Sequence, residues 1–283
     1  MTSSKDWQHP KHSLREHKLG AKRSFSQNFL TDRRVAEAIV RALEITSTED
    51  KVVEFGPGTG SLTSLIVAEG VELWAVERDR EMAEVLRGRF GAMPQFHLVE
   101  DDAARVDMQG WVAGEPGRLK LIGNLPYAST GAILRNLMQQ SALLERAVVM
   151  MQREVFERLR ASPGTKAYGA LTLFLGAHYR VEKVLDVAPG AFFPPPKVRS
   201  TVVRLWPRQS AAQNHWEAFE RVVRQSFSSR RKTLRTSLKQ AGFPSPTLEM
   251  LWQRSGIDGG QRPETLDEDA FLRMAEILYP PES

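Results

Sequence analysis

The sequence predicts an α/β protein in which a mostly parallel sheet precedes a small helical domain. Three observations support this fold class. Between about residues 31 and 161, short apolar runs alternate with amphipathic segments, which is typical of a parallel sheet with helices on both faces. A glycine-rich turn, GPGTG at 56–60, follows the first apolar run. Beyond residue 207 only helical patterns remain.

The elements of the sheet domain follow in order along the chain. Asp32 can cap a first helix that carries Val35, Ile39 and Leu43 on one face. Apolar runs then predict strands at 51–55, 71–77, 95–99, 119–124 and 146–152, and amphipathic spacing predicts helices at 61–70, 80–90, 131–140 and 154–161.

The later part of the chain changes character. The segment 198–207 reads as a strand ended by Pro207, and residues 208–215 read as a polar linker. Helices are expected at 216–227, 230–241, 245–255 and 267–279. We therefore divide the chain into a basic N-terminal extension (1–24), a sheet domain (25–207) and a small helical domain (208–283).

Composition excludes several classes of protein and site. The 283-residue chain has no cysteine, which excludes disulfides, thiolate metal sites and cysteine nucleophiles. No apolar run approaches 18 residues, and the N-terminus lacks the apolar core of a secretory signal. The six histidines form no ligand set. We expect a cytoplasmic enzyme without a metal, a membrane span or a covalent nucleophile.

Positive charge is concentrated in two segments. The net charge is +5 overall, +4 within residues 1–24 and +9 within residues 197–240, so the rest of the chain is acidic. Clustered cations favour a polyanionic partner such as structured RNA, because neutralised phosphates release their counterions. The alternatives are a solvated surface with a floppy basic tail and, for 227–240, a solvated amphipathic helix. Within 227–240 we place Arg231, Arg235 and Lys239 on one helical face, and the predicted RNA-binding residues are Arg230, Arg231, Lys232, Arg235, Lys239 and Lys197.

The glycine turn indicates a nucleotide-type cofactor. Gly56, Gly58 and Gly60 lie between a strand and a helix, where glycine allows a tight turn and close approach to a ligand. Glu77 ends the next strand and can accept hydrogen bonds from both ribose hydroxyls. Asp102 follows the third strand and can hold the exocyclic amine of an adenine. Alone, such a loop can also be a simple turn.

The acidic character of this turn separates two cofactors. Glu54 and Pro57 suit a pyrophosphate poorly. S-adenosylmethionine has no phosphate and carries a sulfonium and an amino group, so an acidic pocket favours it over NAD. Gln27, Asn28 and Leu30 precede the first helix and are expected at the amino-acid end of the cofactor, unless they form only a helix-entry contact.

The segment NLPY, Asn124–Tyr127, ends the fourth strand beside this cofactor. The Asn124 side-chain oxygen and the Leu125 carbonyl, freed by the Pro126 turn, can accept the two N–H groups of an adenine amine and favour its pyramidal, nucleophilic form. Tyr127 can stack on the base. The alternative is an Asx-type turn with a packed tyrosine.

The segment AFFPPPKVRS is a second rigid stretch. Three consecutive prolines hold an extended backbone. Phe192 or Phe193 can close the other face of the base, or both can be core residues beside a stiffened crossover.

These motifs, together with FSQNFLTD, AVERD, EDDA and FSSRRKTLRTSL, resemble in their order the KsgA (RsmA) ribosomal RNA adenine dimethyltransferases from about residue 20 onward. The resemblance implies a Rossmann-like seven-stranded sheet whose last strand is antiparallel, and a small helical domain. It also implies N6-dimethylation of two adjacent adenosines in the 3′-terminal hairpin of 16S ribosomal RNA, by a monomer acting on a pre-30S particle.

The resemblance also assigns roles by position. It implies that Asn28, Leu30, Gly56, Gly58, Glu77, Asp102 and Asn124 contact S-adenosylmethionine, and that Asn124, Leu125, Pro126, Tyr127 and Phe192 form the catalytic motif. Two alternatives remain open: an Erm-type enzyme acting on 23S RNA, and a non-catalytic assembly or transcription factor. Residues 1–19 extend beyond a minimal member, as an additional RNA contact or a disordered arm.

Overall fold

The computed structural model describes residues 7–20, 27–112, 119–229 and 231–280, and these form two compact units. The first unit comprises Met1–Phe156 and Val181–Pro207, and the second comprises Glu157–Arg180 and Arg208–Ser283. The two units also divide between residues 207 and 208, where the sequence predicts a domain boundary. Residues 157–180, however, group with the C-terminal helices. Hydrogen bonds from Gly164 N–H to the Glu264 carbonyl and from the Tyr168 hydroxyl to the Leu266 carbonyl hold them there.

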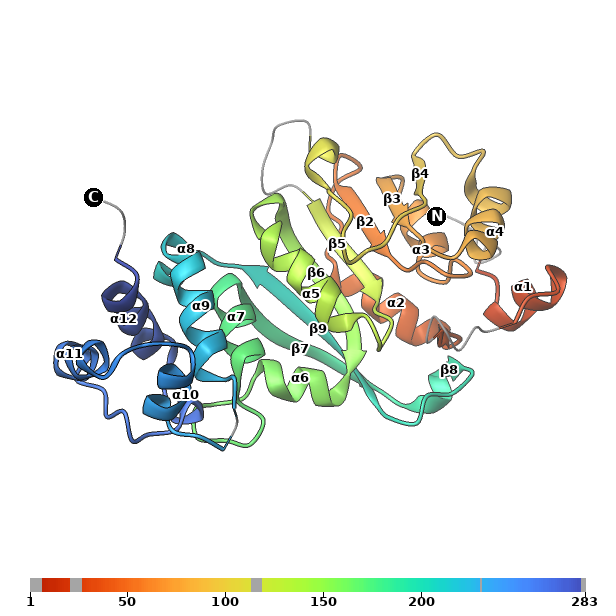
Figure 1. The fold of residues 1–283 in the computed structure, drawn as a ribbon. Coiled ribbons are helices and arrows are strands. Elements are labelled where there is room, and N and C mark those ends of the chain that lie inside the picture. The colour runs from red at the N-terminus through yellow and green to blue at the C-terminus, as the bar shows by residue number, and fades with distance from the viewer. Residues whose placement is uncertain (1–6, 21–26, 113–118, 230, 281–283) are drawn as a thin grey trace. The chain divides into compact units, whose positions relative to one another are not determined.

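The first unit is built on a seven-stranded sheet in the order β4-β3-β2-β5-β6-β9-β7 (Figure 1). Its strands are β2 (Lys51–Phe55), β3 (Glu72–Val76), β4 (Phe96–Val99), β5 (Leu119–Asn124), β6 (Leu144–Gln152), β7 (Tyr179–Val187) and β9 (Ser200–Pro207). Strands β2 to β6 pair in parallel, whereas β9 runs antiparallel to β6. The seven strands and the antiparallel last strand are confirmed.

The five parallel strands form where apolar runs predict them, because they are buried on both faces. Four of the five residues of β2 and five of the six of β5 are buried. Strand β7 was not predicted. Its sequence, YRVEKVLDV, is charged and mostly solvent-accessible, as an edge strand allows.

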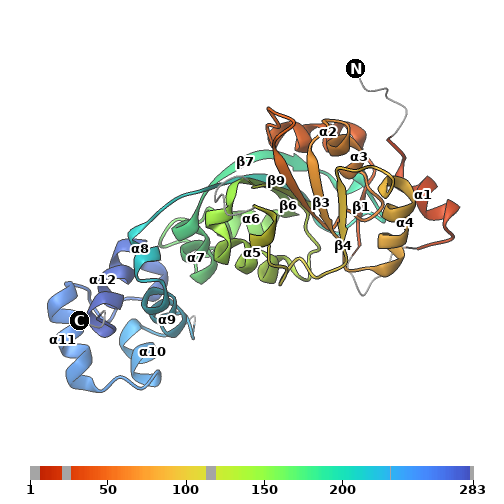
Figure 2. The ribbon, with the colours of Figure 1, turned by 90° about the horizontal axis from the view of Figure 1, so that it is seen from above.

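Helices cover both faces of this sheet (Figure 2). The helices of this unit are α2 (Arg33–Ala42), α3 (Thr63–Val67), α4 (Arg80–Phe90), α5 (Thr130–Gln139) and the beginning of α6 (Arg153–Leu159). Asp32 caps α2 as predicted, accepting hydrogen bonds from the Arg34 and Val35 amides. Helices α2, α3 and α4 contribute Ile39, Ile66 and Leu86 to one core cluster with the strands, while α5 lies on the opposite face (Figure 2).

The order of the strands creates a switch point between β2 and β5. From β2 the chain proceeds outward through β3 and β4, and from β5 it proceeds the other way through β6. Phe55 pairs with Gly123 across this point. A Cβ on Gly123 would lie 2.7 Å from the Phe55 carbonyl oxygen, so only glycine permits this approach. Ligands of open α/β sheets bind at the carboxyl ends of the strands here.

The second unit is helical. Besides the rest of α6 it contains α7 (Ala170–His178), α8 (Ala211–Asn214), α9 (Trp216–Ser226), α10 (Leu234–Gln240), α11 (Ser245–Ser255) and α12 (Glu268–Leu278). Two predictions were wrong. The segment 208–215 is not only a linker, because a capped turn of helix forms after Ser210. Arg231 does not share a helical face with Arg235 and Lys239, because Thr233 caps α10 and the helix begins at Leu234.

Two smaller features complete the first unit. The two-residue strands β1 (Phe29–Leu30) and β8 (Phe192–Phe193) pair antiparallel, and α1 (Pro10–Glu16) forms within the N-terminal extension.

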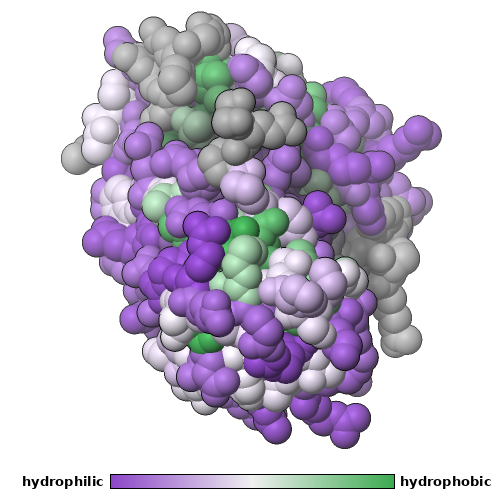
Figure 3. All heavy atoms as spheres, turned by 60° about the vertical axis from the view of Figure 1, so that its left-hand side comes forward, coloured by the Kyte–Doolittle hydropathy of each residue, from purple (hydrophilic) through white to green (hydrophobic). Residues whose placement is uncertain are grey.

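On the face of the molecule in Figure 3, hydrophilic side chains predominate and hydrophobic ones appear only as small patches.

Candidate active site

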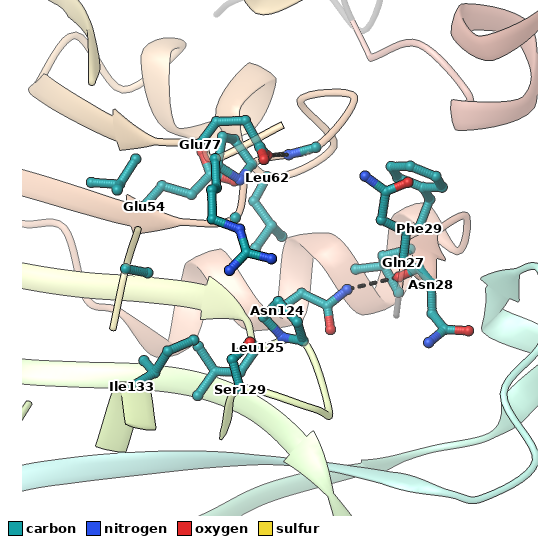
Figure 4. Close-up of a pocket in the computed structure, with 18 of the residues that line it drawn as sticks. Gln27, Asn28, Phe29, Glu54, Leu62, Glu77, Asn124, Leu125, Ser129 and Ile133 are labelled. Carbon is teal, nitrogen blue, oxygen red and sulfur yellow. Dashed lines mark hydrogen bonds between the residues drawn. The ribbon is translucent and has the colours of Figure 1, made fainter. Parts of the chain in front are cut away.

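A pocket opens at the carboxyl edge of the sheet, beside the switch point between β2 and β5 (Figure 4). It is lined by the glycine turn, by the ends of β3 and β5, and by residues just before and within β1. The predicted site residues that line it are Asn28, Leu30, Gly56, Gly58, Glu77, Asp102, Asn124, Leu125, Pro126 and Tyr127. The structure thus brings together segments up to about a hundred residues apart in sequence.

The glycine turn forms one wall of the pocket. Gly56, Gly58 and Gly60 all have positive φ, at 69°, 56° and 84°, a conformation that L side chains rarely adopt. The Gly56 amide donates to the Val76 carbonyl, which ties the turn to the end of β3. A Cβ on Gly58 would lie 3.1 Å from the Phe29 ring. The turn therefore presents bare backbone to the pocket, as the sequence predicts.

Two acidic side chains, Glu54 and Glu77, are buried at this wall. Glu54 is 1% exposed and accepts a 2.6 Å hydrogen bond from the Thr63 hydroxyl. Burial raises its pKa to about 8, and the nearby Glu77 adds to the rise. Glu77 accepts hydrogen bonds from the Gly58 and Asp79 amides at 3.0 and 2.8 Å. Burial raises the pKa of Glu77 as well.

No cationic side chain is among the partners found for Glu54 and Glu77 within the described residues. Buried carboxyl groups are normally paired with a cation or a metal. The donor set therefore fits a ligand that brings its own positive charge, such as a sulfonium or an amino group.

Asp102 also lines the pocket. It lies just past the end of β4, two strands away from β2, which leads into the glycine turn. Its carboxylate accepts hydrogen bonds from the Ala104 amide at 2.9 Å and from Arg78 at 3.1 Å. Burial opposes ionisation of Asp102, but these two partners outweigh it and hold its pKa below the ordinary value. An adenine amine that binds Asp102 must compete with Arg78, whose side chain is half exposed.

The Asn124 side chain has a defined orientation (Figure 4). Its amide nitrogen lies 2.9 Å from the Asn28 carbonyl oxygen. Because a carbonyl can only accept, the atom facing it must be the N–H₂ group. The Asn124 carbonyl oxygen is thereby turned away from Asn28 and left to accept a hydrogen bond from a ligand.

The rest of the NLPY segment is held by its own turn and by β9. The Leu125 amide donates to the Met150 carbonyl, and the Pro126 carbonyl accepts from the Ser129 amide and the Thr130 hydroxyl. The Tyr127 hydroxyl lies 2.7 Å from the hydroxyl of Ser200, which is fully buried at the start of β9. The Tyr127 ring is therefore pinned at its far end while it lines the pocket.

Phe192 is not among the residues that line this pocket. It is 4% exposed and belongs to the core cluster with Leu30. Its neighbour Phe193 is only half buried and packs at the edge of a separate small cluster. The stacking role of Phe192 stays a prediction.

The predicted RNA-binding cations lie in both units. Lys197 is exposed in the first unit, and Arg231, Lys232, Arg235 and Lys239 belong to the second. Arg235 forms an ion pair with Glu249, which offsets part of its charge. Arg230 lies outside the described residues.

The described part of the chain offers neither a metal-binding cluster nor a membrane-spanning helix. No cluster of three or more histidine or acidic side chains is arranged to hold a metal ion there. Nor does any described helix have the length and apolar character to cross a membrane.

Several pocket residues escaped the sequence analysis. Arg78, Ser129 and Ile133 line the pocket, and Ser200 supports Tyr127 from outside it. Arg78 was detectable, since it directly follows the strand-end acid Glu77. Ser200 was not, because nothing local connects the start of β9 with Tyr127.

Known sequences of one family match this chain over most of its length. Residues 18–279 match the sequence model of the ribosomal RNA adenine dimethylase family. A ribosomal RNA small subunit methyltransferase A from Pseudomonas savastanoi pv. phaseolicola is 41% identical over 91% of this chain and 94% of its own. The protein of the same name from Myxococcus xanthus is 43% identical, over 96% of this chain and 95% of its own.

Two solved structures share the fold. A dimethyladenosine transferase from Plasmodium falciparum superimposes with a TM-score of 0.70 at 25% identity, covering 87% of this chain and 95% of that one. The 23S rRNA methyltransferase ErmE superimposes with a TM-score of 0.62 at 27% identity, covering 89% of this chain and 99% of that one.

Proposed function

The chain belongs to the ribosomal RNA adenine dimethylase family, and from this premise we propose that it dimethylates N6 of two adjacent adenosines in the 3′-terminal hairpin of 16S ribosomal RNA. It is an S-adenosylmethionine-dependent ribosomal RNA methyltransferase, and its similarity to proteins named as small-subunit methyltransferases supports the small subunit as its substrate. We further propose that it acts as a cytoplasmic monomer on a pre-30S particle.

The residues of the pocket fit this cofactor. When bound, S-adenosylmethionine supplies an activated methyl group on a sulfonium. Glu77, at the end of β3, is placed to accept the ribose hydroxyls, and Asp102 to accept the adenine amine. Glu54 lies in the wall beside the glycine turn, where its carboxyl can balance the positive charge of the ligand.

The observation that carries the proposal is the orientation of Asn124. Because its N–H₂ group donates to the Asn28 carbonyl, its oxygen faces the ligand as an acceptor for one N–H of the target amine. The Leu125 carbonyl, at the same strand end, is placed to accept the other. Two such acceptors favour a pyramidal nitrogen whose lone pair is available for attack on the methyl carbon. The transfer would break the bond between the methyl carbon and sulfur, leave a neutral thioether, and release one amine proton to solvent. The monomethylated nitrogen keeps a single N–H, so only one of the two acceptors can hold it during the second methylation.

Tyr127 provides the surface for the target base. Its hydroxyl is held by Ser200, so the ring keeps one orientation while a flipped adenine stacks against it. Stacking of this kind contributes about 1–3 kcal/mol.

An Erm-type activity is the second candidate, since ErmE shares the fold. The two relatives named for the small subunit are 41% and 43% identical, against 27% for ErmE. This difference favours the small subunit.

The test compares small and large ribosomal particles from cells that lack this protein. Purified protein with radiolabelled S-adenosylmethionine is expected to label small-subunit particles, and mass spectrometry is expected to locate dimethyladenosine at two adjacent positions near the 3′ end. Labelling of large-subunit particles alone would support the Erm-type alternative. Absence of any transfer, with normal cofactor binding, would overturn the proposed reaction.

A further inference from the structure

Helix α1 lies ahead of residue 18, where the match to the family begins, and the sequence explains why it forms. The His9 side chain accepts a hydrogen bond from the Lys11 amide, and Pro10 occupies the first helical turn, where its missing N–H costs nothing. At the other end, Lys18 adopts a positive φ of 56°, and the Leu19 amide donates back to the Leu14 carbonyl. The segment is a capped helix, not an unstructured tail.

One side of α1 is docked on the wall of the pocket. Leu14 is 3% exposed and packs in a small cluster with Phe29 and Met82, with Leu19 and Phe193 at its edge. Phe29 itself lines the pocket and contacts the glycine turn. Phe29 also pairs with Phe193 in the β1–β8 ladder. Helix α1 is therefore attached beside the opening that the target base must enter.

Two exposed cations flank the docked side of α1. Lys11 and Arg15 are exposed and lie four residues apart, so they share one face of the helix. The Lys11 ammonium lies 4.8 Å from the centre of the Phe193 ring, above the segment that continues to the exposed Lys197. Like charges at this spacing destabilise an isolated helix, and a bound polyanion would relieve that repulsion.

We propose that α1 is a substrate-RNA contact, in which Lys11 and Arg15 bind the phosphate backbone of the strand that delivers the adenine to Asn124. This inference rests on the proposed function, because it takes ribosomal RNA as the ligand of the pocket. The docking of Leu14 on Phe29 sets the distance between the phosphate contacts and the pocket. The contact is electrostatic and independent of sequence, so it adds affinity and positions the RNA without selecting the base.

The test removes the two charges and keeps Leu14, the buried side chain that anchors the helix. In Lys11→Ala/Arg15→Ala, the affinity for unmethylated small-subunit particles at about 100 mM salt is expected to fall about tenfold. The slope of log K against log salt is expected to decrease by about 1.5, since each lost phosphate contact removes about 0.7–0.9. The KM for particles should rise, while kcat and the affinity for S-adenosylmethionine stay unchanged.

Arg41→Glu is the matched control. It changes the net charge by the same amount, at an exposed position in the last turn of α2, away from the pocket. It should alter particle binding by less than twofold. An unchanged slope in the α1 variant, or an equal loss in the control, would overturn the proposal. If wild-type protein fails to methylate the particles, the proposed function fails, and the salt-dependent binding still decides the role of α1.

Discussion

The amino edge and the carboxyl edge of the sheet in the first unit hold charged side chains in opposite ways. At the amino edge, charged side chains are paired. Lys120, which is 2% exposed, lies 2.8 Å from Asp50. Arg204 lies 2.9 Å from Glu44, which also binds Arg146. At the carboxyl edge, Glu54 and Glu77 have hydroxyl and backbone partners, and no cation is found beside them in the described residues.

The pKa values follow this difference. At the amino edge, the hydrogen bond from Arg146 lowers the pKa of Glu44. Burial opposes ionisation of Asp50, but Lys120 and two backbone amides lower its pKa overall. At the carboxyl edge, burial raises the pKa of both Glu54 and Glu77. At the amino edge, the acids have cationic partners in the free protein. At the carboxyl edge, the positive charge is the one that the cofactor brings.

The comparison contrasts partly or fully exposed acids that have cationic partners with the buried acids Glu54 and Glu77. Paired acids at the amino edge should contribute to stability and be indifferent to ligand. Unpaired acids at the carboxyl edge should cost stability and be coupled to ligand. Variants at the two edges can therefore be distinguished by which property they change.

The largest effect is expected at the carboxyl edge, for Asn124→Ala. Loss of the oriented acceptor should lower the rate of methyl transfer about 10²–10³-fold, the range for removing one preorganised hydrogen-bonding group at a reacting centre. Binding of particles should be retained, and single-turnover methylation measures the rate. A normal rate in this variant would contradict the catalytic role of Asn124.

The second effect belongs to the amino edge. Lys120→Met leaves the partly buried Asp50 without its cation and should lower the free energy of unfolding of the first unit by about 2 kcal/mol. Affinity for the cofactor should not change, as measured by calorimetry on the folded protein. Lys51→Met is the control, because Lys51 begins the neighbouring strand and bonds only the Trp111 carbonyl among the described groups. It should cost less than about 1 kcal/mol. Equal losses in both variants would contradict the special role of the Lys120 pair.

The third prediction concerns protons at the carboxyl edge. With a pKa of about 8, Glu54 is mostly protonated at pH 7 in the free protein. A cationic ligand lowers this pKa, so binding should release a proton, and cofactor affinity should rise by up to about tenfold per pH unit until pH 8. Titration calorimetry in buffers of different ionisation enthalpy measures the release. Glu54→Gln should abolish it; the same release in that variant would assign the proton to another group.

The smallest effect is expected for Arg78→Leu. Its ion pair with Asp102 is half exposed and therefore worth at most about 1 kcal/mol. Removing it frees Asp102 for the adenine amine and removes a cation near the ligand, so cofactor affinity should increase up to about fivefold at low salt. The difference should shrink as salt is added. Weaker binding in the variant would indicate that Arg78 itself contacts the cofactor.

Much of the fold was predictable because its signals are local. Strands β2 and β5 match their apolar runs residue for residue, and α4 occupies the segment 80–90 that amphipathic spacing predicts. The segments that were missed have weak local signals. Strand β7 is polar because it is an edge, and α8 is a single turn inside a polar stretch.

The features of the candidate site were predictable or not for the same reason. The glycine turn and the strand-end acids were predictable, because positive φ and a position after a buried strand are properties of short segments. The burial of Phe192 in the core was not, because either phenylalanine of the FFPPP segment can face inward until β8 pairs with β1.

The amino-acid sequence by itself determined the alternation of strands and helices, the backbone of the glycine turn, and which residue types end each strand. Tertiary structure alone decided that the Asn124 amide meets the Asn28 carbonyl, 96 residues away, and that Tyr127 meets Ser200, 73 residues away. The physical reason is range. Periodicity and φ preferences act over a few residues, whereas these contacts exist only after the whole sheet has packed and set the order of its strands.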